Sequence, residues 1–328
     1  MNVMMLVDLS VIILGLGLLW QAGDHVVHYT IELARRYNVS TFFLGFIVLA
    51  IAADIPELAI AFTSAIQGAS EVSVGDIIGA NFTDVALVVG STLLLAGNKI
   101  SVKKSDTRKL LITLFITAIV MAIVFALGVI NRWHGLILIG VYMVAIIWLW
   151  KTRDQDSMHP EPAVVVPEQP ADTNVMQDSM PVLLFKLLIS FIVVTLSSGM
   201  TVHFAVALAT KLQVPLEIIG ATILGVGTSL PELALSLNAL RRGDYGLALG
   251  PTLGTVLGQT TFILGTLAVL SKNPVSVVGL DWAFWFMFAA FGVIAYGLVR
   301  GEKMGRGTGA VLISLFAAYL GYQARFGL

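Results

Sequence analysis

The tetrapeptide Pro-Glu-Leu-Ala occurs twice in the chain, at residues 56–59 and again, 175 positions later, at residues 231–234. At this shift the surrounding sequence stays in register without a gap, so that glycines and one histidine of the first half fall on identical residues of the second. Helix packing alone could repeat glycine and proline, but it gives no reason to repeat an acid. We infer that the chain contains an internal duplication.

The composition indicates that this duplication lies in a lipid bilayer. Of the 328 residues, 57% are apolar and only 12% are charged, and the mean hydropathy is +0.91. Soluble globular proteins are about 45–50% apolar and about 25% charged. The net charge of −1 gives no reason to expect a nucleic-acid surface. The absence of Cys from the sequence excludes a disulfide scaffold, a thiolate metal site and a Cys nucleophile.

Ten stretches are apolar and long enough to cross a bilayer, which takes about 20 residues. They cover residues 4–34, 41–66, 73–96, 109–128, 133–150, 182–209, 216–240, 246–271, 276–299 and 308–326. Ten crossings place all but four of the 19 Lys and Arg residues on one side of the membrane. Because such cations mark the cytoplasmic side, both termini are expected outside.

Each half of the chain holds five of these stretches. Residues 1–150 form the first five-helix repeat and residues 182–328 the second, while the polar, Pro-rich and acidic segment 151–181 is typical of a flexible cytoplasmic linker. Because five is odd, the second repeat must enter the membrane from the opposite face. The predicted fold is therefore an all-α membrane protein with ten transmembrane helices in two inverted-topology five-helix repeats. Secondary transporters use this plan, with a site at the midplane.

Four acids fall well inside the apolar stretches, namely Asp54, Glu57, Asp84 and Glu232. A charged group at the bilayer centre costs about 2.5–3.5 kcal/mol on insertion scales, and no Lys or Arg lies at matching depth. Either these acids hydrogen-bond to neighbouring helices, or they are neutralised by protons or bound cations. Two prolines, Pro56 and Pro231, should interrupt the helices beside the acids and free backbone carbonyls. Such an oxygen-only set of ligands suits Ca²⁺.

The segment Gly227–Leu233, which reads Gly-Thr-Ser-Leu-Pro-Glu-Leu, resembles the signature of the sodium/calcium exchanger family of the calcium/cation antiporter superfamily. The resemblance implies ten helices in two inverted halves with a loop after the fifth. It also implies that Glu57 and Glu232 bind Ca²⁺ and competing Na⁺, and that hydroxyl oxygens complete the Na⁺ sites. By position the resemblance implies Glu57, Glu232, Thr228, Ser229 and Asp84 as ligands, and Thr255 and Gln259 can stand for the usual Ser and terminal amide. Asp54 is not a family ligand, but as one of the four buried acids it is expected to add charge or a proton site.

The first half departs from the family pattern. Ala53 and Asp54 stand where the family has Thr and Ser, Ala80 replaces a Ser, and Asp76 replaces an Asn. Two hydroxyl ligands are missing, and two carboxylates at i, i+3 repel each other, which favours a proton on one of them. These departures leave H⁺ open beside Na⁺ as the coupling ion, and Mg²⁺ or Mn²⁺ open beside Ca²⁺ as the transported ion.

The sequence predicts a secondary active antiporter, and not an enzyme, that exchanges Ca²⁺ or a related divalent cation for Na⁺ or H⁺ by alternating access. Its expected partners are inorganic cations and the lipid bilayer, with no cofactor and no nucleic acid, and its expected location is a prokaryotic inner membrane. Two alternatives stay open. One is a non-transporting membrane protein that binds or senses cations, and the other is an intramembrane hydrolase whose paired Asp residues activate water.

Two histidines occupy equivalent places in the two halves, His28 and His203. Hydrogen bonding between helices is the simpler interpretation of both, with proton sensing as the alternative. Asp24 precedes His28 by four residues, so the two are expected to pair on one helix face.

Overall fold

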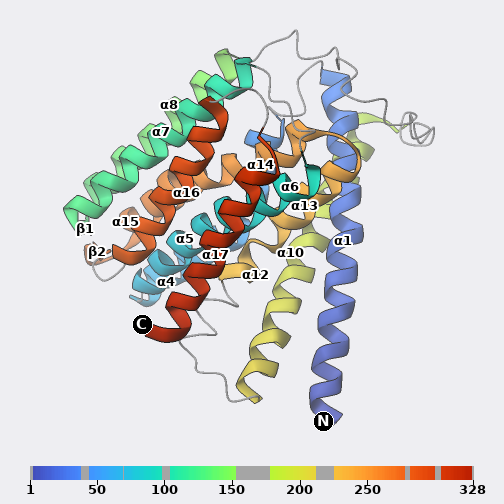
Figure 1. The fold of residues 1–328 in the computed structure, drawn as a ribbon, viewed down its shortest axis with the longest axis horizontal. Helices are drawn as coiled ribbons and strands as arrows, with labels where there is room; N and C mark the ends of the chain where they lie inside the picture. The colour runs from blue at the N-terminus through green and yellow to red at the C-terminus, as the bar shows by residue number, and fades with distance from the viewer. Residues whose placement is uncertain are drawn as a thin grey trace.

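The computed structural model describes residues 3–37, 44–68, 70–97, 104–152, 178–211, 225–277, 281–299 and 304–326. Helices account for most of them, as Figure 1 shows. The first half comprises α1 (Val3–Tyr37), the π-helix η1 (Gly45–Leu49), α3 (Ala50–Ala53), α4 (Ile55–Gln67), α5 (Ser70–Thr83), the π-helix η2 (Asp84–Val89), α6 (Gly90–Ala96), α7 (Lys104–Leu127) and α8 (Arg132–Lys151). The second comprises α10 (Met180–Lys211), α12 (Gly225–Thr228), α13 (Leu230–Arg241), α14 (Tyr245–Gly258), the π-helix η5 (Gln259–Ile263), α15 (Leu264–Leu270), α16 (Asp281–Val299) and α17 (Arg306–Phe326).

Seven helical stretches of the described chain are long and apolar enough to cross a membrane. They are Met5–Tyr37, Ser73–Ala96, Thr107–Leu127, Arg132–Lys151, Met180–Thr201, Tyr245–Leu270 and Trp282–Val299. All seven coincide with predicted spans. Of the other three, two coincide with the interrupted helices η1–α3–α4 and α12–α13, and the last coincides with α17. The protein is thus a mostly helical membrane protein, and the full count of ten spans stays a prediction.

Two of the candidate spans form the buried centre of the molecule. These are α5–η2–α6 and α14–η5–α15, which are far more buried than the other five. Around them lie α7, α8, α16 and α17, whose apolar side chains complete one continuous core. A helix that is apolar on all sides and largely buried leaves little surface for lipid. Most polar side chains on these two central spans, among them Asp84 and Gln259, are therefore enclosed by protein.

The helices α1 and α10 form an antiparallel pair along one side of the molecule (Figure 1). At one end Lys211 Nζ lies 2.5 Å from Asp8 Oδ2. At the other end Arg36 Nη1 donates to the carbonyl of Asp178, at 2.7 Å, just before α10 begins. The pair is therefore tied at both ends.

The prediction of an entirely helical chain overlooked one short strand pairing. Strand β1 (Val129–Ile130), between α7 and α8, pairs antiparallel with β2 (Val275–Ser276), between α15 and α16. Two-residue strands have no periodicity that a sequence pattern could detect. The pairing brings together two loops that were both predicted on the outer side.

Candidate cation-binding site

The helix that carries Glu57 is interrupted at Asp54. Helix α3 ends at Ala53 and α4 begins at Ile55, and Asp54 between them has ψ near zero (φ −73°, ψ −2°). Proline lies in the first turn of α4, where its missing N–H costs nothing because that group has no partner within the helix. The predicted interruption beside the acid is present, and Glu57 falls in the first turn of the new helix.

The helix that carries Glu232 has the same interruption at Ser229. Helix α12 ends at Thr228, α13 begins at Leu230, and Ser229 again has ψ near zero (φ −84°, ψ 3°). Residues 54 and 229 correspond under the 175-residue shift that aligns the two tetrapeptides. In both places the acid lies three residues after the break, in the first turn of the new helix, where the helix dipole favours a negative charge.

The two central spans also change geometry at equivalent positions. The π-helix η2 begins at Asp84, directly after α5, and η5 begins at Gln259, directly after α14. These residues too correspond under the 175-residue shift. Single turns of π-helix inside an α-helix often occur at functional sites, since the extra residue redirects a side chain.

Close backbone contact brings the central span α14 against the first interrupted helix. A Cβ placed on Gly254 would collide with the carbonyl oxygen of Phe46, and a Cβ on Gly258 would lie 2.5 Å from Asp54 Oδ2. Only glycine leaves room for both contacts. The carboxylate of Asp54 therefore lies directly against the turn that leads into Gln259.

Most of the candidate ligands are enclosed. Glu57, Asp84, Glu232, Thr255 and Gln259 have no exposed surface, Ser229 and Asp54 have 2% and 6%, and Thr228 is half-buried. Seven of the eight have buried oxygen atoms without a hydrogen-bond partner in the described part of the chain. Both oxygens of Glu57, Asp84 and Glu232 are in this state. Buried polar groups without partners are rare in native proteins, and each calls for an explanation.

The four acids predicted from the sequence come together. Glu57 is close enough to Glu232, Asp54 and Asp84 to interact with their charges, and Glu232 interacts with Asp84 and Asp54. Gln259 lies beside both Asp54 and Asp84. Ser229 lies beside Asp84, which joins the interrupted helix of the second half to the central span of the first.

The two threonines among the candidates are used differently. Thr255 donates its hydroxyl hydrogen to the carbonyl of Pro251 one turn earlier, at 2.7 Å, so its oxygen keeps lone pairs that could face an ion. The hydroxyl oxygen of Thr228 is buried and makes no hydrogen bond with the described residues.

Two further polar residues, Asp76 and Asn81, belong to the same surroundings, although neither was among the candidate ligands predicted from the sequence. Asp76 interacts with the charges of Glu57 and Asp84, and its Oδ2 is buried without a partner among the described residues. Asn81 is fully buried, and its Nδ2 donates to the carbonyl of Ile77 at 2.7 Å. Asp76 could have been found from its spacing to Asp84, because residues eight positions apart lie near one face of a helix.

These acids do not form a ready-made metal cage. Among the described residues, no three His, Asp or Glu side chains lie close enough to hold a metal ion by themselves. Carboxylates close to one another repel, so they do not gather tightly by themselves. A cation held here would need the neutral oxygens of the candidate set as well, because Ca²⁺ takes six to eight oxygen ligands.

Comparison with known proteins identifies the family. The sequence profile described as sodium/calcium exchanger protein matches residues 7–151 and 182–325, which is most of the chain. The chain belongs to the sodium/calcium exchanger family. The two matched parts lie on either side of residues 152–181.

Several relatives match over nearly their whole length. CaxA of Alkalimonas amylolytica, assigned as an antiporter, is 28% identical over 326 residues, which is 97% of this chain and 98% of CaxA. The sodium/calcium exchanger MaX1 of Methanosarcina acetivorans is 25% identical, over 97% and 98% of the two chains. The inner membrane protein YrbG of Escherichia coli K12 is 23% identical, over 96% of each.

The fold is that of a solved exchanger. The structure of the sodium-calcium exchanger NCX_Mj soaked with 100 mM Na⁺ and 10 mM Sr²⁺ has a TM-score of 0.79 to this chain at 23% identity, covering 98% of this chain and 99% of that one. Members of the family are transmembrane cation antiporters rather than enzymes, and the chain is of this class. The family transports inorganic cations.

Proposed function

We propose that this antiporter exchanges Ca²⁺, or a related divalent cation, for Na⁺ or H⁺ by alternating access at the carboxylate cluster around Glu57 and Glu232. The observation that supports this most strongly is the burial of both side chains with every carboxylate oxygen unpaired among the described residues. Glu57 and Glu232 then serve to bind a cation, because carboxylates that served only to join helices would accept hydrogen bonds from the neighbouring helices.

Each candidate residue has a role in this proposal. Glu57 and Glu232 are the central ligands, one from each half. Asp54 and Asp84 add negative charge or hold a proton. The neutral oxygens of Thr228, Ser229, Thr255 and Gln259 complete the coordination, and Asp76 adds charge at the edge of the cluster.

Competition between ions supplies the coupling. An unneutralised carboxylate at the membrane centre costs about 2.5–3.5 kcal/mol, so enclosing an empty cluster of four is strongly unfavourable. The site therefore closes readily only when a divalent cation, or Na⁺ or H⁺ in its place, has entered. Exchange follows without a separate gate, because each reorientation requires an occupied site.

The missing hydroxyls bear on the coupling ion. Ala53 and Ala80 stand where the family resemblance places Thr and Ser, and alanine has no oxygen to offer Na⁺. Asp54 adds a group that can take up a proton instead. We therefore include H⁺ beside Na⁺ in the proposal.

The proposed topology has ten spans in two inverted repeats, with residues 151–181 on the cytoplasmic side and both termini outside, in a prokaryotic inner membrane. Three observations support it. The interruptions at Asp54 and Ser229 correspond, and so do the π-helices at Asp84 and Gln259. The predicted outer loops also meet, since Ser70 Oγ lies 2.8 Å from Ser271 Oγ beside the strands β1 and β2.

Uptake of radiolabelled calcium into proteoliposomes tests the proposal. We expect uptake driven by an outward Na⁺ gradient, by a pH gradient, or by both, and its loss in Glu232→Gln. Asp244→Asn is the matched control: it removes an acid that accepts from Leu247 N at the start of α14, and Asn caps helices equally well.

Two outcomes would contradict transport. Absence of uptake under either gradient, together with stabilisation of the wild type by Ca²⁺, would favour a cation sensor. Peptide cleavage that disappears in Asp54→Asn would favour a hydrolase. Unchanged uptake in Glu232→Gln would remove this residue from the site.

A further inference from the structure

The helices α1 and α10 are built to behave as one unit. Ion pairing of Asp8 with Lys211 ties one end, and the hydrogen bond from Arg36 to Asp178 ties the other. Between these ends the backbones approach closely, since a Cβ on Gly15 would meet the hydroxyl of Thr201. A shift of α1 along the molecule would therefore carry α10 with it.

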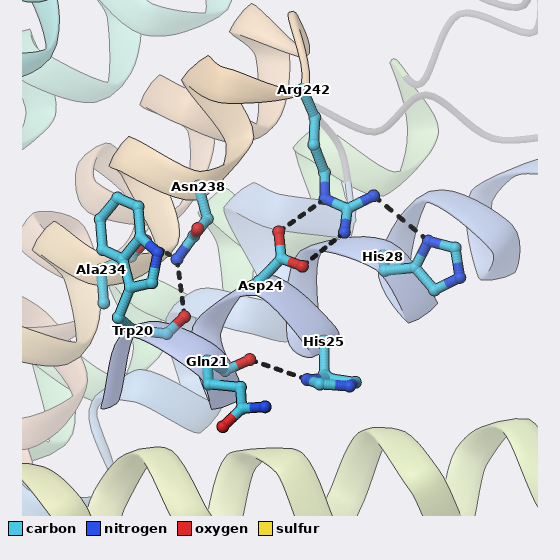
Figure 2. Close-up of polar contacts among 8 residues, drawn as sticks. All are labelled: Trp20, Gln21, Asp24, His25, His28, Ala234, Asn238 and Arg242. Atoms are coloured by element: carbon cyan, nitrogen blue, oxygen red, sulfur yellow. Dashed lines mark hydrogen bonds and ion pairs between the residues drawn. The ribbon is translucent and has the colours of Figure 1, made fainter. Parts of the chain in front are cut away.

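This helix pair meets the rest of the bundle at a polar joint on α13, drawn in Figure 2. Arg242, the C-cap of α13, holds both carboxylate oxygens of Asp24, with Nε 3.0 Å from Oδ1 and Nη2 2.7 Å from Oδ2. Its Nη1 lies 3.4 Å from Nδ1 of His28. Asp24 and His28 thus share a contact with Arg242, whose planar fork fits a carboxylate with two parallel bonds.

The joint continues along the same two helices. Asn238 Nδ2 donates to the carbonyl of Trp20 at 3.1 Å, and Arg241 lies over the indole ring, 5.2 Å from its centroid. A Cβ on Gly23 would lie 3.3 Å from Cβ of Ala234, so the two backbones are nearly in contact. These contacts hold α1 against α13 in one defined register.

The joint and the candidate cation site share one helix. Ser229 occupies the N-cap position of α13, Glu232 lies in its first turn, and Arg242 occupies its C-cap position. Ten residues separate Glu232 from Arg242, which corresponds to about 15 Å of helix. The positions of Arg242 and Glu232 are thereby fixed to each other.

We propose that Arg242 is a positioning residue for transport, and that its pairing with Asp24 holds the seam between α1 and α13 closed in the state described here. This inference rests on the proposed function. The distribution of Lys and Arg over the loops puts Arg242 at the predicted cytoplasmic end of α13. A seam that is closed at this end blocks the cytoplasmic route to the site and so favours access from outside. Opening toward the cytoplasm requires the pair to separate.

Apparent affinities at the two membrane faces test this directly. In an alternating-access carrier the apparent Kd at one face is the intrinsic value divided by the fraction of carriers open to that face. We expect Asp24→Asn and Arg242→Gln each to raise the ratio of outer to inner KM for Ca²⁺ about two- to fivefold, as suits a partly exposed ion pair. The double variant should show the same change as either single one, and Asp24→Arg with Arg242→Asp should restore part of it.

Lys186→Gln provides the matched control. It breaks an ion pair of 2.6 Å with Asp178 that lies within the α1–α10 unit and does not reach α13. Its KM ratio should equal that of the wild type. Equal KM ratios in wild type, Asp24→Asn and Arg242→Gln would overturn the proposal. A loss of transport rate in these variants that is explained entirely by a lower melting temperature would overturn it as well.

A second readout does not depend on transport. Because the chain contains no Cys, Ala234→Cys introduces a single thiol, and this position is only 5% exposed. Adding Asp24→Asn should accelerate its reaction with a water-soluble thiol reagent about two- to fivefold. An unchanged labelling rate would contradict the proposed role of the Asp24–Arg242 pair, even if the protein showed no exchange. A faster labelling rate in a protein without exchange would contradict only the proposed function.

A disulfide shows whether the seam has to open. The Cβ separation expected for Gly23→Cys with Ala234→Cys is close to the 3.5–4.5 Å that disulfides require. Oxidation should abolish exchange, and a reductant should restore it, whereas each single variant should be insensitive. Full exchange by the cross-linked protein would show that α1 and α13 move together, and would overturn the proposal.

Discussion

Gly258 lies against the carboxylate of Asp54, with 2.5 Å between Oδ2 and the position that a Cβ on this glycine would take. The contact joins the interrupted helix of the first half to the central span of the second, one residue before Gln259. It therefore connects two parts of the candidate site that lie far apart in the sequence.

Gly258→Ala should impair ion binding while sparing the fold. The added methyl group meets the end of a side chain, which can rotate away, so Asp54 would be displaced from the cluster. We expect apparent Ca²⁺ affinity to fall several-fold, with a loss of stability within the usual range of about 0.5–3 kcal/mol for single substitutions. Titration of Ca²⁺ uptake together with thermal unfolding measures both.

Gly254→Ala is the contrasting variant. Its methyl group meets the backbone carbonyl of Phe46, which cannot rotate away. The melting temperature should fall more than in Gly258→Ala, at similar expression. If both variants lost stability equally and kept their affinity, the contact with Asp54 would have no part in binding.

Neutralising the central acids should stabilise the ion-free protein. A buried Gln costs less to enclose than a buried carboxylate without a partner, so Glu57→Gln with Glu232→Gln should melt at a higher temperature than the wild type without cations. Ca²⁺ should stabilise the wild type by about 2.7 kcal/mol at a hundred times its Kd, and leave the double variant unchanged. A double variant that Ca²⁺ still stabilises would place the site elsewhere.

Restoring the missing hydroxyls should change the coupling ion. Ala53→Thr with Ala80→Ser returns two oxygens that suit Na⁺, and both positions are buried near the cluster. We expect Na⁺-driven uptake to increase relative to pH-driven uptake. The ratio of the two initial rates in matched proteoliposomes measures this, and an unchanged ratio would show that these positions do not contact the ion.

Asp76→Asn should weaken binding without abolishing it. Asp76 interacts with Glu57 and Asp84 but is only partly buried. Removal of a charge at the edge of a cluster reduces attraction for a cation, and we expect KM to rise a few-fold with turnover nearly constant. A loss as complete as that of Glu232→Gln would make Asp76 a direct ligand instead.

Much of the architecture could be predicted because it depends on patterns local to the sequence. Hydropathy located the seven candidate spans, and the repeated tetrapeptide located the interruptions at Asp54 and Ser229. Both features follow from composition and from the missing N–H of proline. The association of the four acids followed from the high cost of leaving any of them alone in lipid.

The features that were missed depend on packing between distant segments. The π-helices at Asp84 and Gln259 were not predicted, because no residue pattern that was read from the sequence marks them. The contact of Asp24 with Arg242 was not predicted, because Arg242 comes from a segment 218 residues away. Sequence patterns indicate contacts between residues that are close along the chain, and they give no sign of partners from distant segments.

The central claim is that one divalent cation binds between Glu57 and Glu232. Anomalous diffraction from crystals soaked in Sr²⁺, used here as a heavier substitute for Ca²⁺, tests it most directly. We predict a single strong peak within about 2.3–2.8 Å of carboxylate oxygens of both residues, slightly beyond the range for Ca²⁺, and its loss in Glu232→Gln crystals. A peak elsewhere, or one that survives this substitution, would contradict the account.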